Sequence, residues 1–224
     1  MRMEARPTMM YIENIFVLLA APLIACLFCV RGKPRTVVAC LLVGMTACLA
    51  SAYVSAFIAQ ATELDAVRTA VEIAPSVEET AKLLPLLFYL VLLEPDADDA
   101  DLAFIMVAVG FATMESAFYL SDSGLSDPVM LLLRGLSTAM MHVVCGVVVG
   151  YGLTHAWKRL WLRAAGTFGL LCLASTYHGI FNLLVAAGGP ALVAAVVLPL
   201  ATLIPLLVAR RHRQRSEGGS PAIQ

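Results

Sequence analysis

Charged residues are scarce in this sequence, and this scarcity indicates whether water or lipid surrounds the folded chain. Only 14% of the 224 residues are charged, 60% are hydrophobic, and the mean hydropathy is +0.86. Soluble domains carry about 25% charged residues, so this composition excludes an ordinary soluble fold and predicts an integral membrane protein in a lipid bilayer. The net charge of −1 provides no basic surface for nucleic acid, because the basic clusters lie where membrane topology alone explains them.

The six cysteines give no sign of a metal or redox site. All of them fall within apolar stretches, where a thiol usually behaves as a small buried hydrophobic side chain. The pair Cys26 and Cys29, in the segment CLFC, is on this ground structural and not a pair of ligands. Any chemistry therefore has to come from other side chains.

The apolar residues fall into blocks of about the 20 residues that a helix needs to cross a bilayer. Short polar turns or turns with proline and glycine separate the blocks, and the alternation typical of a membrane barrel is absent. The sequence predicts an all-α membrane protein, a polytopic bundle of about seven transmembrane helices. The expected spans are residues 11–30, 36–60, 73–93, 101–120, 128–154, 165–187 and 190–209.

These spans leave little room for a soluble domain, so residues 1–209 are predicted to form a single transmembrane domain. The amphipathic segment 60–73 is expected to lie at the membrane interface. Residues 210–224 are polar and are expected to form a disordered cytoplasmic tail.

Lysine and arginine indicate which way the bundle faces, because basic loops tend to stay in the cytoplasm. With seven spans, one side receives only Arg2, Arg6 and Arg68. The other side receives Arg31, Lys33, Arg35, Lys158, Arg159, Arg163 and the segment RRHRQR. The chain is therefore expected to be a multi-pass membrane protein with its N-terminus outside and its C-terminus in the cytoplasm.

Ionisable side chains within the spans are the candidates for function. A charge at the centre of a bilayer costs at least ~2.5–3.5 kcal/mol, so such residues usually face a protein interior or an aqueous cavity. The third to sixth spans each carry one or more ionisable residues. They are Glu78, Glu79 and Lys82, then Glu115, then Arg134 and His142, and finally His178 with the neighbouring Asn182.

The spacing of these residues places them on common helix faces. Glu78 and Glu79 precede Lys82 by four and three residues, so both carboxylates can reach the ammonium group. One glutamate can then be neutralised while the other reacts. His178 and Asn182 are one turn apart and face one neighbour. With the N-terminus outside, the two glutamates and the histidines can meet in the outer half of the membrane.

This set of side chains supports hydrolysis. Two histidines and a carboxylate are ligand types for a catalytic zinc that keeps one position for water. The predicted ligands are Glu115, His142 and His178. A further glutamate, Glu78 or Glu79, takes the proton from the attacking water, and Asn182 donates a hydrogen bond to the developing oxyanion. Without a metal, a glutamate held by histidine and asparagine can activate water directly.

Four short motifs occur in order on four successive spans. They are EETAK at Glu78–Lys82, FATME at Phe111–Glu115, His142, and HGIFN at His178–Asn182. Together they resemble the motifs of the PrsW family of intramembrane proteases, which is related to the CAAX prenyl endopeptidases and the bacteriocin-processing proteins. In those relatives the second motif typically ends in histidine, whereas here it ends in Glu115, which favours the PrsW branch. The resemblance covers about residues 75–184.

The resemblance implies a polytopic endopeptidase of a bacterial or archaeal inner membrane, with its site among the core helices, here about residues 73–187. It implies that Glu78 and Glu79 correspond to the essential paired glutamates, and that His142 and His178 correspond to the essential histidines. The family's best-known role is the first cleavage of a membrane-anchored anti-sigma factor outside the membrane. The implied substrate is accordingly a single-pass membrane protein.

Two other classes of protein remain open from the sequence. Buried Glu, His and Lys also form proton relays, as in a proton-coupled transporter or a channel component, although no internal repeat is evident and the site is displaced outward. A non-catalytic membrane scaffold of the same fold would retain the same polar positions. The two glutamates would also be structural if they only formed an interfacial salt bridge with Lys82.

Overall fold

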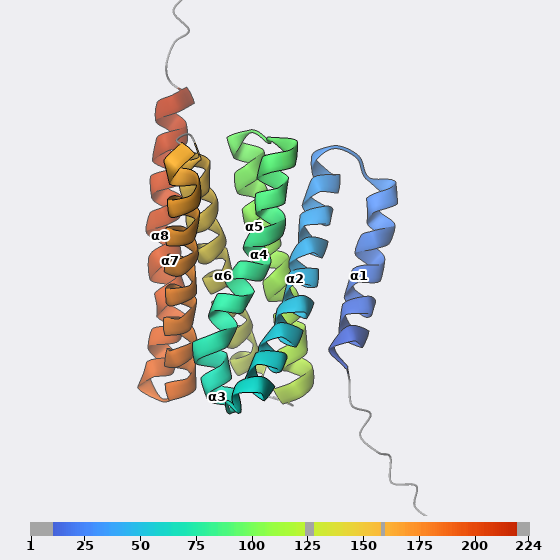
Figure 1. Ribbon diagram of the computed structural model, residues 1–224, viewed down its shortest axis with the longest axis vertical. Coiled ribbons are helices and arrows are strands. Elements are labelled where there is room, and N and C mark those ends of the chain that lie inside the picture. Colours follow the sequence, from blue (N-terminus) through green and yellow to red (C-terminus); the bar gives the residue numbers. More distant parts are fainter. Residues whose placement is uncertain (1–10, 124–127, 158–159, 219–224) are drawn as a thin grey trace, which may run out of the picture.

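The computed structural model describes residues 11–123, 128–157 and 160–218, and these residues contain helices but no strand. Seven helices in these ranges are at least 18 residues long (Figure 1). They are α1 (Ile12–Cys29), α2 (Lys33–Thr62), α4 (Ala74–Leu93), α5 (Ala97–Ser123), α6 (Pro128–Ala156), α7 (Leu160–Ala187) and α8 (Pro190–Gly218). A short helix, α3 (Ala66–Arg68), and a π-helical turn, η1 (Thr69–Ile73), connect α2 to α4. The predicted all-α bundle of about seven helices is confirmed.

Glycine sets two of the helix boundaries. Gly188 and Gly189 have φ values of 64° and 52°, a region that glycine adopts without strain, and Pro190 begins α8 directly after them. Gly32, with φ of 65°, turns the chain in the same way before Lys33 begins α2. Turns this short make α1 and α2, and likewise α7 and α8, antiparallel neighbours.

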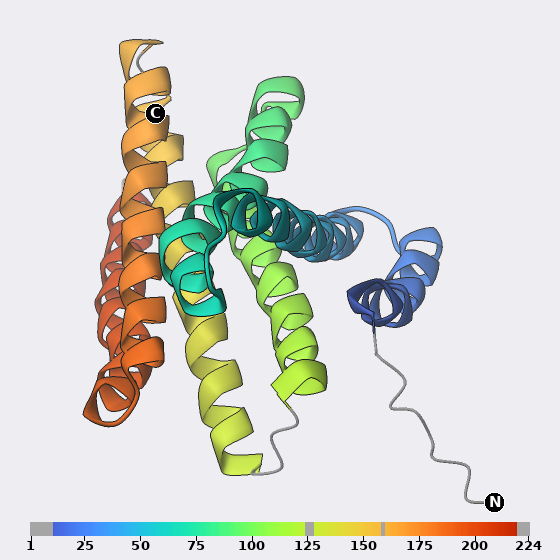
Figure 2. The same cartoon turned by 60° about the horizontal axis from the view of Figure 1, so that its bottom comes forward.

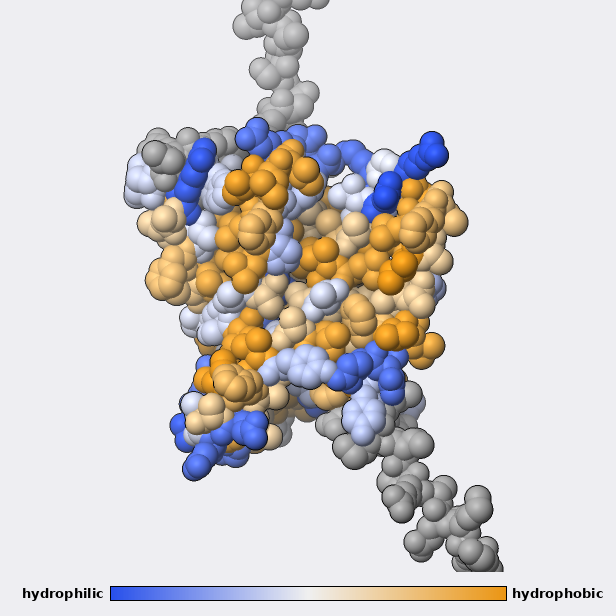
Figure 3. All heavy atoms as spheres, turned by 45° about the vertical axis from the view of Figure 1, so that its right-hand side comes forward, coloured by the Kyte–Doolittle hydropathy of each residue, from blue (hydrophilic) through white to orange (hydrophobic). Residues whose placement is uncertain are grey.

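Six of the seven long helices in the described ranges are long and apolar enough to cross a membrane. The seventh, α4, has 20 residues but carries Glu78, Glu79 and Lys82 in its first half. On the face shown in Figure 3, hydrophobic side chains predominate across the middle of the molecule, and hydrophilic side chains gather toward its two ends. The chain is a multi-pass membrane protein. The helices around α4 have to enclose its charged residues.

The main apolar core lies between α4, α5, α6 and α7, with one contribution from α8. Its buried members include Leu83 of α4, Phe104 of α5, Met141 of α6 and Phe181 of α7. These four helices are also the ones that carry the predicted site residues. The charged and the apolar parts of the interior are therefore built by the same helices.

Glycine brings α2 and α5 into backbone contact. A Cβ atom added to Gly44 of α2 would collide with the backbone of Val107 and Phe111, and one added to Gly110 of α5 would collide with the backbone of Leu41. Close approach through small residues is a usual way for membrane helices to associate. Helix α1 lies on the outer side of α2, at the edge of the bundle (Figures 1 and 2).

The last helix continues past its predicted span. The sequence predicts that this span ends at residue 209 and that a disordered tail follows, whereas α8 remains helical to Gly218. Arginine and glutamine have high helix propensity, and basic residues near a helix C-terminus interact favourably with the helix dipole. The helix therefore does not have to end where the apolar sequence ends. Residues 219–224 lie outside the described part of the chain.

Gly110→Ala is expected to destabilise the bundle, because its Cβ atom would meet the backbone of Leu41. Overpacking of this kind typically costs about 1–3 kcal/mol, so the melting temperature of the detergent-solubilised protein should fall. Gly169→Ala in α7 is the matched control, since nothing lies within 4 Å of a Cβ atom there and alanine favours a helix by about 1 kcal/mol. An unchanged melting temperature for Gly110→Ala would contradict the close packing of α2 and α5.

Candidate active site

Helix α4 presents its charged residues to the interior of the bundle. Glu79, Lys82, Leu83 and Leu86 recur at the spacing of one helix face, and all four are buried. The side chain of Glu78 is 16% exposed and that of Glu79 is 5% exposed. The inward face of α4 is therefore charged near its start and apolar farther along.

A buried ion pair joins Glu79 to Lys82. The Nζ atom of Lys82 lies 2.7 Å from Oε1 of Glu79. The same ammonium group lies 2.9 Å from Nδ1 of His142 and 4.9 Å from the centre of the Phe111 ring. A buried charge is tolerated when it is paired and its remaining donors are satisfied. Lys82 therefore connects α4 to Phe111 on α5 and to His142 on α6.

The contact with Lys82 defines the tautomer of His142. An ammonium group has no lone pair, so Nδ1 of His142 accepts the hydrogen bond and the ring proton is on Nε2. The Nε2 atom lies 2.5 Å from Oε2 of Glu115 on α5 and donates to it. A continuous series of hydrogen bonds therefore leads from Lys82 through His142 to Glu115.

Glu78 and His178 each carry a buried polar atom that has no hydrogen-bond partner among the described residues. Nδ1 of His178 lies 2.9 Å from Oε1 of Glu79 and donates to this carboxylate, which leaves a lone pair on Nε2. Nε2 of His178 lies 3.7 Å from Oε2 of Glu78, and these are the two unpartnered atoms. This separation is too long for a direct hydrogen bond but allows both atoms to contact one shared water molecule or ion.

The donor atoms suit a metal ion. Ligand atoms of Glu78, His142 and His178 lie within 4.8 Å of one another. Carboxylate oxygen and imidazole nitrogen are zinc ligands, and a ligating histidine usually donates its other N–H to a carboxylate, as His178 does to Glu79. Glu78 and His178 fit a cation as they stand, whereas His142 offers a lone pair only after one of its two hydrogen bonds is given up.

Glu115 and Glu78 occupy different places around the two histidines. The sequence predicts Glu115 with the two histidines as ligands, whereas Glu78 lies with the histidines in the group of possible ligands. Glu115 is next to this group as the acceptor of the hydrogen bond from His142. The sequence identifies both glutamates as candidates for the site. Which of them lies near both histidines depends on how α4 and α5 pack against α6.

Asn182 forms a contact that the sequence does not reveal. Its Nδ2 atom donates to the carbonyl oxygen of Ala70 in η1 over 2.9 Å. The predicted oxyanion donor therefore uses one of its two N–H groups for the protein backbone. A sequence motif cannot show that a side chain binds a backbone carbonyl. Pro75 is an indirect sign, because proline lacks an N–H and a carbonyl just before α4 therefore needs another donor.

Arg134, near the start of α6, lies against an aromatic ring. Its guanidinium group is 4.3 Å from the centre of the Tyr119 ring. This cation–π contact is a structural role for Arg134. The residues that the structure brings together are therefore the glutamates of α4 and α5 and the histidines of α6 and α7.

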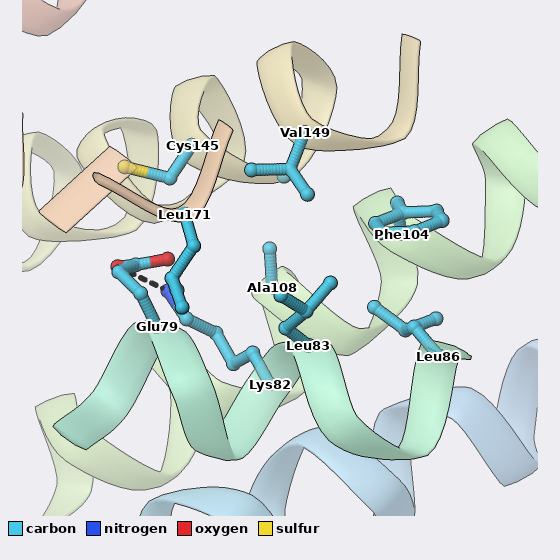
Figure 4. A pocket seen from close by; sticks show the side chains of 10 residues that line it. Glu79, Lys82, Leu83, Leu86, Phe104, Ala108, Cys145, Val149 and Leu171 are labelled. Atoms are coloured by element: carbon cyan, nitrogen blue, oxygen red, sulfur yellow. Dashed lines mark hydrogen bonds and ion pairs between the residues drawn. The ribbon is translucent and has the colours of Figure 1, made fainter. Parts of the chain in front are cut away.

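An apolar layer follows the charged group along α4. A cavity of about 20 Å³ has Glu79 and Lys82 at one end and Leu86 and Phe104 at the other (Figure 4). A cavity of this size holds about one water molecule. The apolar end belongs to the main core of the bundle. The charged group is thus bounded on this side by hydrophobic side chains.

A polytopic helical bundle that encloses glutamates and histidines with unpartnered atoms has the architecture of a membrane-embedded hydrolase. The model of a protein family described as PrsW family intramembrane metalloprotease matches residues 32–209, from the start of α2 into α8. The chain belongs to this family and is a protease. The predicted family is confirmed, and the protease is favoured over the transporter and the scaffold. Searches of curated proteins and of solved structures gave no match.

Lys82→Met is expected to destabilise the protein, because it leaves the buried carboxylate of Glu79 without its cation. Removing one partner of a buried ion pair typically costs about 3–5 kcal/mol. Glu79→Gln combined with Lys82→Met removes both charges and should recover most of this loss. Unfolding of the wild type, the two single variants and the double variant in detergent measures the coupling. Additive effects would show that the two charges do not stabilise each other.

Proposed function

We propose that the protein hydrolyses a peptide bond with a water molecule held between Oε2 of Glu78 and Nε2 of His178. The observation that supports this proposal is the pair of buried, unpartnered atoms 3.7 Å apart. A water molecule between them can donate one hydrogen bond to the carboxylate and one to the imidazole lone pair. Its own lone pair is then available to attack the carbonyl carbon of the substrate.

Each buried group has a separate role in this mechanism. Glu78 takes the proton from the attacking water and returns it to the nitrogen of the leaving amine as the C–N bond breaks. Glu79 is already ion-paired, and it holds the proton of His178 on Nδ1 so that Nε2 faces the water. Glu115 accepts from His142 and orients that ring.

Zinc is the metal proposed for this site, since the family is described as a metalloprotease family and the donors are carboxylate and imidazole. The arrangement favours Glu78, His142 and His178 as the residues that would hold it. When bound, zinc polarises the substrate carbonyl and lowers the pKa of the attacking water. In this zinc-bound form Glu78 would be a ligand and not the proton acceptor, and Glu115 beside the ligands would accept the proton on its Oε1 atom, since its Oε2 atom pairs with His142.

The proposed substrate is a single-pass membrane protein, such as an anti-sigma factor, cleaved near the outer face of the membrane. The glutamates are near the start of α4, at the end of the bundle where α1 begins and opposite the end of α8 (Figure 1). The basic residues favour this end as the outer one. In this topology residues 1–209 form one transmembrane domain, with the catalytic core at about 73–187 and the tail in the cytoplasm.

Glu78→Gln and Glu79→Gln are each expected to abolish cleavage of a single-pass membrane substrate by the purified protein in liposomes. The amide retains the volume of the side chain but removes the proton acceptor or the group that orients His178, and general base catalysis contributes about 10²–10⁴-fold. Glu63→Gln, at an exposed position between α2 and α3, is the matched control. Full activity of both site variants in correctly inserted protein would exclude these glutamates.

Metal analysis separates the two forms of the mechanism. With zinc at the site, the purified wild type should contain about one zinc per chain, a chelator should remove activity, and added zinc should restore it. His178→Ala should lose the metal, whereas Glu63→Gln should keep it. A wild type that stays active without metal after exhaustive chelation would exclude zinc and leave the same side chains as a water-binding group.

A further inference from the structure

The π-helical turn η1 leads directly into the two glutamates of α4. The N–H of Ala74 donates to the carbonyl of Thr69, five residues earlier, which is the wide pattern of a π-helix. Turns of this kind are rare and often occur at functional sites. α4 follows without a break, and Glu78 and Glu79 lie in its second turn. The geometry of η1 therefore sets the position of both glutamates.

Pro75 accounts for the π-turn and leaves a carbonyl without a backbone donor. In a regular α-helix the proline ring clashes with the carbonyl four residues earlier, so a wider turn is favoured. In the five-residue pattern that Ala74 begins, the donor to the carbonyl of Ala70 would be residue 75, and proline has no N–H. A carbonyl left unpaired in the interior costs free energy, so another donor is needed.

Asn182 supplies this donor from α7. Its Nδ2 atom lies 2.9 Å from the carbonyl oxygen of Ala70. Gly179, between His178 and Asn182, faces the same region, because a Cβ atom added there would make ordinary van der Waals contact 3.6 Å from the carbonyl oxygen of Val71 and 3.8 Å from Cγ of Pro75. One face of α7 thus contacts η1, the start of α4 and the glutamates in succession.

We propose that Asn182 is a positioning residue that acts through η1. It pairs the carbonyl that Pro75 leaves open, and it thereby holds the start of α4 at the distance from His178 that the water site requires. This inference rests on the proposed hydrolysis at Glu78 and His178. It differs from the oxyanion role predicted from the sequence, in which Asn182 contacts the substrate. Only the positioning role depends on the residue at position 75.

A double-mutant cycle with Pro75 tests the proposal. In the wild-type background Asn182→Ala should lower kcat by about 10–100-fold, as is typical when a residue behind a site is removed. In the Pro75→Ala background the new N–H can pair with the carbonyl of Ala70, so the same substitution should lower kcat no more than about threefold. A donor to the oxyanion would cost about 10²–10³-fold in both backgrounds, and equal large losses would overturn the proposal.

Hydrogen exchange gives a second test that needs no activity. Amides of residues 69–77 should exchange about three- to tenfold faster in Asn182→Ala than in the wild type, and α8 serves as the internal control. The double variant with Pro75→Ala should restore slow exchange. Unchanged exchange in Asn182→Ala overturns the proposal even if Pro75→Ala is itself inactive. If Glu78→Gln and Glu79→Gln remained active, the proposed hydrolytic site would be excluded. The exchange result would still decide the role of Asn182.

Discussion

The ion pair between Glu79 and Lys82 is the interaction on which the interior of this bundle depends. Each of these charges would be costly alone in an apolar interior, and together they contact all three neighbouring core helices. The ammonium reaches Phe111 on α5 and His142 on α6, and the carboxylate reaches His178 on α7. Helix α4 can therefore carry charges inside an apolar bundle, because the neighbouring helices supply partners for them.

This network also distinguishes the glutamates from one another. Glu79 is held by a lysine and a histidine, and Glu115 is held by His142, whereas Oε2 of Glu78 has no partner among the described side chains. A carboxylate oxygen that is already paired has less capacity to accept a proton from water. Satisfied groups thus orient the two imidazoles, and the unsatisfied atoms mark the proposed place of the reaction.

Close backbone packing and an irregular turn also position the helices around this network. Gly44 and Gly110 allow α2 and α5 to meet backbone to backbone, and Pro75 opens the turn just before the charged part of α4. A proline within reach of another helix is tolerated when a side chain from that helix pairs the freed carbonyl, as Asn182 does. Helix α7 is thereby hydrogen-bonded both to α4, through His178 and Glu79, and to the turn η1 directly before it, through Asn182 and Ala70.

The sequence alone determined that the chain lies in a membrane, how many long helices it forms, and on which helix each polar residue lies. These properties follow from apolar run length and from the scarcity of charge, which are local quantities. The motifs also brought Glu78, Glu79, Glu115, His142 and His178 into one predicted site. Only the tertiary structure showed that Glu78 lies near both histidines while Glu115 pairs with His142, and that Asn182 pairs with Ala70. Such choices depend on differences of an ångström or two between residues far apart in the chain, and helix packing, which no local pattern encodes, sets those distances.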